Sequence, residues 1–141
     1  MLDDSTEAAG HLLRLPGVAV VVDGYNVAKA AWPHLSTAEQ RAHLLDAMEA
    51  LASRTGTQPM VVFDGADVGS VGTGSAPRQQ VRVRFSPAGV EADDVVLELA
   101  AEVPATRPVV VVSSDRRVRD GARALGANVM STAQCRAVMG V

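Results

Sequence analysis

Carboxylates follow three apolar segments of this chain. The segments and the acids after them are residues 18–22 before Asp23, residues 60–63 before Asp64, and residues 109–112 before Ser113, Ser114 and Asp115. In a parallel α/β sheet the carboxyl ends of the strands share one edge, so these carboxylates are expected to converge on one crevice. Carboxylates brought together repel each other unless a cation or a proton neutralises them. The spacing therefore predicts a divalent-metal site.

A second acidic element, Glu91, Asp93 and Asp94, falls in the first turn of an expected helix. The helix dipole favours negative charge there by about 0.3 to 1 kcal/mol per residue. Capping likewise gives an ordinary role to Asp23 and Asp115, and an Asp-Gly turn explains Asp64. Capping does not explain two adjacent aspartates that oppose each other, or acids on the strands that flank the switch point of the sheet. The combination therefore favours a metal site.

Carboxylate oxygens are hard ligands that suit Mg²⁺ or Mn²⁺. The chemistry that such a site supports is in-line attack of a metal-activated water on a phosphodiester. Asp23 is the first candidate ligand, followed by Asp94 and Asp115. Asn26 has two candidate roles, a hydrogen bond to the attacking water or a phosphate, and a backbone-bonding turn residue.

Composition and pattern describe the scaffold for these residues. The 141 residues suit one domain, and 48% hydrophobic with 3% aromatic content predicts an aliphatic core. A single cysteine and acidic residues at the start, where a signal peptide carries positive charge, favour a reducing, cytoplasmic compartment without a membrane partner. We expect a polar lead-in over residues 1–16 and one domain over residues 17–141.

Strand and helix patterns alternate along that domain. We expect strands at 18–22, 60–63, 81–85, 109–112 and 128–130, a loop over 65–80, and helices after Asp23, from Ser36 or Thr37 to Gly56, and at 93–101 and 116–125. Strands separated by helices imply right-handed crossovers and a mostly parallel sheet covered on both faces.

Four segments of the chain, in this order, closely resemble the motifs of the NYN domain, in particular its YacP-like branch within the PIN-like nuclease superfamily. They are Val22-Asp23-Gly24-Tyr25-Asn26-Val27, Val62-Phe63-Asp64-Gly65, Gly89-Val90-Glu91-Ala92-Asp93-Asp94-Val95-Val96 and Val111-Val112-Ser113-Ser114-Asp115-Arg116. The resemblance implies a three-layer α/β/α fold with five strands in the order 3-2-1-4-5, a Mg²⁺ or Mn²⁺ site and RNA cleavage.

The resemblance also implies roles for individual residues. It assigns Asp23, Asp94 and Asp115 to the metal site, with Asp93 and Glu91 nearby and Asn26 orienting water, metal or phosphate. Arg117 stands where some 5′-nucleases carry a second acid, which departs from their two-metal pattern.

Arginines are the expected RNA contacts. They gather in two groups, Arg78, Arg82 and Arg84, and Arg116, Arg117, Arg119 and Arg123. Arg116 and Arg117 follow the acidic edge, whereas Arg82 and Arg84 share one strand face; both pairs are candidates to hold RNA phosphates. The competing roles are solvated helix charge for the first pair and protection of an edge strand for the second.

The sequence thus predicts a metal-dependent endoribonuclease with RNA as its partner and the ribosome as a candidate site of action. Three alternatives stay open. One is a catalytically weak, RNA-binding NYN module within a larger protein, which the formal net charge of -3 permits. Another is a toxin-like PIN ribonuclease. The third is a phospho-acceptor receiver domain, although its late-strand lysine has no counterpart, since the only lysine is Lys29.

Overall fold

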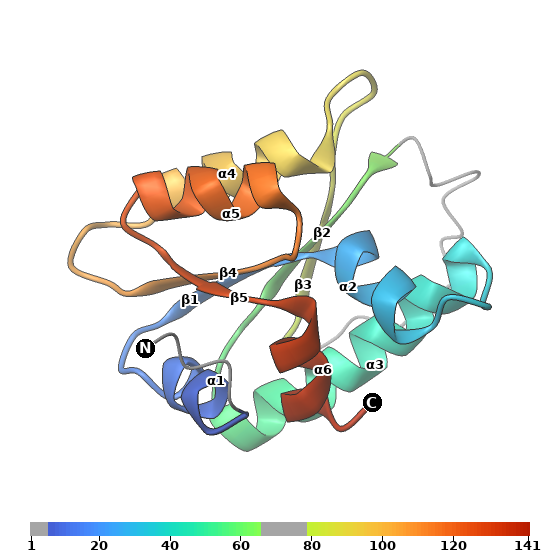
Figure 1. Cartoon of the computed structure of the whole chain (residues 1–141), viewed down its shortest axis with the longest axis horizontal. Coiled ribbons are helices and arrows are strands. Elements are labelled where there is room, and N and C mark those ends of the chain that lie inside the picture. The colour runs from blue at the N-terminus through green and yellow to red at the C-terminus, as the bar shows by residue number, and fades with distance from the viewer. Residues whose placement is uncertain (1–5, 66–78) are drawn as a thin grey trace.

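The computed structural model describes residues 6–65 and 79–141, and its centre is a five-stranded sheet. The strands are β1 (Ala19–Asp23), β2 (Met60–Phe63), β3 (Arg82–Phe85), β4 (Val109–Val112) and β5 (Asn128–Met130). They lie in the order β3-β2-β1-β4-β5, and every neighbouring pair is parallel (Figure 1). The α/β fold and the strand order implied by the resemblance are confirmed.

Six described helices cover the two faces of the sheet. They are α1 (Thr6–Leu13), α2 (Gly24–Ala31), α3 (Thr37–Thr55), α4 (Ala92–Glu102), α5 (Arg116–Ala124) and α6 (Thr132–Met139). Helices α4 and α5 lie on one face, and the other four lie on the opposite face (Figure 1). Among the described helices, none is both long and apolar enough to cross a membrane.

The valine-rich strands are explained by this double cover. Along β1, Val20 and Val22 point into the larger core beneath α1, α2, α3 and α6, whereas Val21 points into the smaller core beneath α4 and α5. A strand with both faces buried needs apolar residues at every position rather than at alternate positions. The core is mainly aliphatic, as composition predicts, and Phe63 is its largest fully buried side chain.

Local signals set most of the element boundaries. Helix α3 begins at a capping box in which Ser36 accepts from the Glu39 backbone, and it ends at Gly56 with a φ of 76°. Strand β1 ends one residue later than predicted, because the backbone of Asp23 still pairs with Val62. Helix α2 starts immediately at Gly24, so no loop separates the strand from the helix.

Helix α6 is the element that sequence analysis missed. Its signal was a second capping box, in which Ser131 accepts from the Gln134 backbone, but the segment is short and near the end of the chain. The lead-in expected over residues 1–16 contains α1, whose Ala9 and Leu13 are buried in the larger core. Most of the loop expected over 65–80, with Arg78, lies outside the described residues.

Candidate functional site

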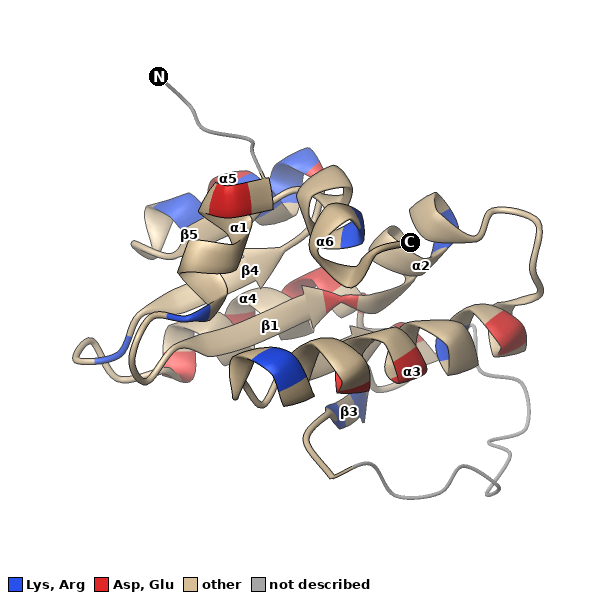
Figure 2. Cartoon of the chain, turned by 90° about the horizontal axis from the view of Figure 1, so that it is seen from below, with Lys and Arg blue, Asp and Glu red and all other residues tan. Residues whose placement is uncertain are grey.

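A crevice of about 410 Å³ opens at the carboxyl edge of the sheet. Its lining residues are Asp23, Tyr25, Asn26, Lys29, Asp64, Glu91, Ala92, Asp93 and Asp115. They come from the ends of β1 and β2, the start of α2, the start of α4 and the turn before α5. Figure 2 shows acidic segments gathered at the carboxyl end of β1 and the start of α4. The structure therefore brings acids far apart in sequence to one place.

Asp23 is the buried member of this group, with 6% of its surface exposed. The Ser113 hydroxyl donates a hydrogen bond of 2.9 Å to its Oδ2 atom. Burial raises the pKa of Asp23 to about 6; the Ser113 hydrogen bond opposes this shift, and the Asp93 and Asp115 carboxylates add to it. A carboxylate held in this way gains from a nearby cation, because a cation offsets both burial and repulsion.

Ser113 connects β1 to the turn after β4. Its hydroxyl also accepts from the backbone N–H of Asp115 at 3.0 Å, and its carbonyl accepts from the Arg119 guanidinium at 3.0 Å. Asp23 and Ser113 are 90 positions apart in the chain. This network fixes the Asp23 carboxylate relative to Asp115 through hydrogen bonds that are largely shielded from solvent.

Asn26 is held at its oxygen and free at its nitrogen. Its Oδ1 atom accepts from the backbone N–H of Ser114 at 2.8 Å and lies 3.4 Å from the Ser113 hydroxyl. Its Nδ2 group has no hydrogen-bond partner within the described parts of the chain. Asn26 thus has the bonds expected of a turn-organising residue and, in addition, two N–H groups that can donate to a ligand in the crevice.

Asp115 combines a capping role with a place in the crevice. As the N-cap of α5, its Oδ1 atom accepts from the backbone N–H of Val118 at 3.2 Å. Its Oδ2 atom has no partner among residues 6–65 and 79–141. The capping role and the functional role therefore use different oxygens of the same side chain.

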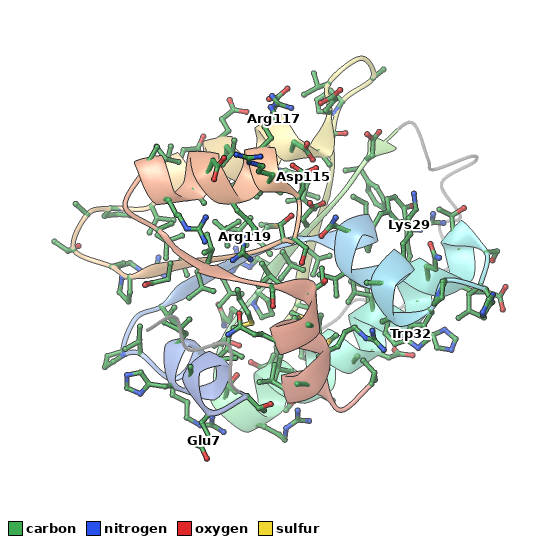
Figure 3. The ribbon with its side chains drawn as sticks, viewed as in Figure 1. Glu7, Lys29, Trp32, Asp115, Arg117 and Arg119 are labelled. Atoms are coloured by element: carbon green, nitrogen blue, oxygen red, sulfur yellow. The ribbon has the colours of Figure 1, made fainter. Side chains whose placement is uncertain are left out.

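Asp93 and Asp94 are separated by the rotation of α4. Asp93 lines the crevice, and its pKa is raised by partial burial and by Asp115. Asp94 is outside the crevice lining and forms an ion pair with Arg117, which also lies 3.0 Å from Glu91 and 3.6 Å from Asp93. Figure 3 shows Arg117 beside α4, with Asp115 at the start of α5 and Lys29 on α2. Of the two aspartates, the structure thus brings Asp93 to the crevice.

Glycine directly after Asp23 permits this strand-to-helix junction. A Cβ atom at Gly24 would lie 2.5 Å from the Phe63 ring and 2.8 Å from the Val62 carbonyl oxygen. The backbone of α2 can therefore approach β2 only without a side chain at this position. The close approach sets where Asp23 ends its strand and where Asn26 faces the crevice.

The four arginines predicted to hold RNA are dispersed. Arg116 is 95% exposed at its side chain and pairs with Asp120, whereas Arg117 contacts the acids at the start of α4. Arg82 and Arg84 are exposed on β3, but Arg84 pairs with Val62 near the carboxyl edge and Arg82 pairs with Met60 at the opposite end. Arg82 is therefore not at the crevice.

Sequence analysis gave no role in the site to Lys29, which lines the crevice, or to Ser113, which donates to Asp23. Asp64, expected at this edge but explained as an Asp-Gly turn, lines the crevice as well. For Lys29 the signal was its place on the helix that follows Asp23. Tyr25, the aromatic residue of the first motif, is buried against Phe63 with ring centroids 4.8 Å apart, and its hydroxyl accepts from Arg41. Tyr25 therefore serves packing at the edge of the site.

The donor set fits a hard divalent cation, since Asp23, Asp93 and Asp115 each keep a carboxylate oxygen without a hydrogen-bond partner in the described parts of the chain. Within residues 6–65 and 79–141, no three acidic, histidine or cysteine side chains are already arranged to hold a metal ion. The cap at Asp115 and the Arg117 ion pairs account for this arrangement. The described residues therefore offer the oxygen donors that Mg²⁺ or Mn²⁺ prefers, without a coordination shell already formed around a common point.

Comparisons with known proteins identify the family and agree with the fold. Residues 20–140 match the family model of the YacP-like NYN domain. The crystal structure of Rae1 (YacP) from Bacillus subtilis is 28% identical, with a TM-score of 0.74 over 86% of this chain and 73% of that one. A mutant of the same Bacillus subtilis protein gives 25% identity and a TM-score of 0.71 over 86% and 74% of the two chains. No curated protein sequence matches significantly.

Proposed function

Since the chain belongs to the YacP-like NYN domain family, which has a nuclease-type, RNA-related fold, we propose that it is a metal-dependent endoribonuclease. Its proposed reaction is hydrolysis of RNA phosphodiester bonds in the carboxyl-edge crevice. The observation that carries the proposal is Asp23, a buried carboxylate facing Asp93 and Asp115, with its pKa raised to about 6. A cation in the crevice would offset this unfavourable charge arrangement, and a divalent ion held by acids can assist phosphodiester cleavage by polarising the phosphoryl oxygen and activating water.

Asp23, Asp93 and Asp115 are the proposed metal-holding residues. Bound there, Mg²⁺ or Mn²⁺ supplies charge neutralisation for the phosphoryl oxygens and a lowered pKa for water. Ser113 positions Asp23 through its 2.9 Å hydrogen bond, so that the carboxylate keeps one oxygen turned toward the crevice. Asp115 is positioned in the same way by its bond to the first turn of α5.

Asn26 and Lys29 are the proposed contacts to substrate. The free Nδ2 group of Asn26 can donate to a phosphate oxygen or orient the attacking water. Lys29 lines the crevice and carries a mobile point charge suited to a phosphate. Both side chains lie on α2, directly after Asp23, so the substrate would be held on the α2 side of the acids.

Arg117 has a different proposed role from a direct RNA contact. Its guanidinium neutralises Glu91 and Asp94, and these two carboxylates raise its own pKa. Asp94 and Glu91 are therefore proposed as charge partners of Arg117, whereas Asp93 is proposed as the α4 residue that serves the metal. One cation in the crevice and one fixed guanidinium beside it would together balance the acids of this edge.

The proposal is tested with purified protein, a labelled circular RNA and Mn²⁺. We expect opening of the circle that requires the metal, and a loss of roughly 1,000-fold in rate for Asp23→Asn and for Asp115→Asn. Asp120→Asn is the matched control. Asp120 is an exposed aspartate of α5, the helix that Asp115 caps, and it pairs with Arg116. Cleavage that survives both crevice substitutions would show that the reaction occurs elsewhere or in a contaminant. A parallel reaction with ribosome-bound RNA compares free and ribosome-bound RNA as substrates.

A second candidate function is RNA binding with weak catalysis. It is favoured by Arg117, which already pairs with acids at the start of α4. Binding of Mn²⁺ and of RNA without any opening of the circle would identify this function. Membership of the family leaves the phospho-acceptor receiver domain without support.

A further inference from the structure

A second cavity lies at the opposite edge of the sheet, where the strands begin. Its volume is about 670 Å³, larger than the crevice, and it lies among the start of β1, the turn between α3 and β2, and the end of α4. None of its described lining residues also lines the crevice. They are Leu13–Val21, Thr55–Gln58, Met60, Arg82, Leu99, Val103 and Arg107.

Among the residues that the structure describes, the charged ones that line this cavity all have one sign. Arg14, Arg82 and Arg107 line it, and no acidic residue of 6–65 or 79–141 is among its lining residues. In a chain whose formal net charge is -3, three arginines in one cavity, with no described carboxylate beside them, are a local excess of positive charge. Such a cavity focuses its field on its own interior and favours an anionic occupant.

Two of the arginines are held by the backbone. The Nε group of Arg107 donates to the Gly17 carbonyl at 2.8 Å, and Nη1 of Arg14 donates to the Gly10 carbonyl at 3.2 Å. The Nη groups of Arg107 have no partner within the described residues. A guanidinium that is already fixed loses less conformational freedom when an anion binds, and its planar fork matches a phosphate.

The arginines extend along the edge rather than meeting at one point. Arg82 begins β3 and Arg107 precedes β4, so three strand spacings of about 4.8 Å each separate the positions they occupy along the edge. Between them the cavity has an apolar lining that includes Leu13, Leu99 and Val103. A ligand with anionic groups and an apolar body of nucleotide size fits this combination better than an isolated inorganic ion.

We propose that the amino-edge cavity binds a phosphate-bearing ligand of nucleotide size through Arg14, Arg82 and Arg107. The phosphate comes either from a free nucleotide or from a strand of RNA, since the two sources present the same group to the arginines. The site is additional to the crevice, and it stands whether or not the crevice cleaves RNA.

Backbone amide NMR of the full chain locates the ligand. AMP and a short 5′-phosphorylated single-stranded RNA are titrated separately in EDTA, so that no metal recruits phosphate to the crevice. We expect the resonances of Gly17, Gly56 and Thr57 to shift, and those of Asp23 and Asn26 to stay. Shifts confined to the crevice, or no shift with either probe, would refute the proposal. Shifts with AMP assign a free nucleotide, and shifts with RNA alone assign a strand.

Substitution of the arginines tests the contacts. We expect Arg82→Gln and Arg107→Gln each to weaken binding about tenfold, since each removes a charge-assisted contact to phosphate. Arg123→Gln is the matched control, because Arg123 is a half-exposed arginine of α5 that pairs with Asp120. An Arg82→Gln protein with unchanged amide resonances but undiminished affinity would also overturn the proposal, because Arg82 makes no side-chain bond within the described residues that its loss could disturb.

Discussion

The two edges of one parallel sheet carry opposite chemistry in this protein. At the carboxyl edge a crevice of about 410 Å³ is lined by acids, and at the amino edge a cavity of about 670 Å³ is lined by three arginines and by no acid of the described parts of the chain. Helices α2 and α5 begin at the carboxyl edge, whereas α3 and α4 end at the amino edge. Anions are favoured at helix starts and cations at helix ends, so the charges of each edge match the helix dipoles.

The comparison also shows a difference in preorganisation. At the carboxyl edge, burial and, to a smaller extent, neighbouring carboxylates raise the pKa values of Asp23 and Asp93, an arrangement that a bound cation would relieve. At the amino edge Arg14 and Arg107 are tied to backbone carbonyls. The two edges should therefore respond differently to substitution, pH and metal.

The largest effect is expected from the pair Asp93 and Asp94. Asp93→Asn should lower the rate of RNA cleavage by roughly 1,000-fold, because Asp93 faces the crevice. Asp94→Asn should lower it by less than about fivefold, because Asp94 pairs with Arg117 outside the crevice. Single-turnover cleavage of the same RNA measures both. Equal losses would show that α4 presents both carboxylates to the reaction.

Asp23 should limit stability at neutral pH. Its pKa is raised from 3.8 to about 6 in the folded protein, so folding favours the protonated form. The stabilisation by the protonated carboxyl is complete below pH 3.8 and is lost as the pH rises through about 6. At neutral pH the ionised side chain therefore lowers the free energy of unfolding by about 3 kcal/mol relative to a carboxyl whose pKa is unshifted. Asp23→Asn should therefore raise the free energy of unfolding at pH 7.5, although we expect it to abolish RNA cleavage.

Urea unfolding in EDTA from pH 4 to pH 8 measures this effect. The advantage of the variant over the natural chain should shrink as the pH falls through about 6 and nearly vanish near the unperturbed pKa of 3.8. An advantage that does not change with pH would mean that charge at Asp23 is not its cause.

Glycines at the two edges should differ in sensitivity. Gly24→Ala should destabilise the fold by about 2 kcal/mol, because its Cβ would lie 2.8 Å from the Val62 carbonyl oxygen. Gly17→Ala at the amino edge should cost about 1 kcal/mol, because Gly17 has a φ of 71° but open space around it. Equilibrium denaturation of both variants measures the two losses of stability. If the steric contact at Gly24 is the cause, Gly24→Ala must lose more stability than Gly17→Ala.

The smallest effect is expected at Arg117. Arg117→Gln removes the cation that partly balances Glu91, Asp93 and Asp94, so Mn²⁺ should bind about fivefold more tightly. Calorimetric titration of Mn²⁺ measures the change, with Arg116→Gln as the control on the same helix. Weaker binding in the Arg117 variant would instead make Arg117 a residue that orders the acids for the metal.

Sequence analysis recovered the fold closely because its signals are local. Capping at Ser36, the αL glycine at Gly56 and apolar valine runs all act within a few residues. Helix α6 was missed although it has a capping box of the same kind at Ser131. A short segment near the end of the chain has little periodic pattern, and its burial against the rest of the core is a tertiary property.

Strand-terminal residues of a parallel sheet share an edge, so the sequence was enough to place Asp23, Asp64 and Asp115 at the same edge of the sheet. Tertiary structure alone decided which neighbouring acid joins them, since the rotation of α4 turns Asp93 to the crevice and Asp94 to Arg117. Tertiary structure likewise placed Arg82 at the amino edge of the sheet and brought the Ser113 hydroxyl within hydrogen-bond distance of Asp23. The reason is that side-chain direction depends on how whole elements pack, and sequence spacing does not specify that rotation.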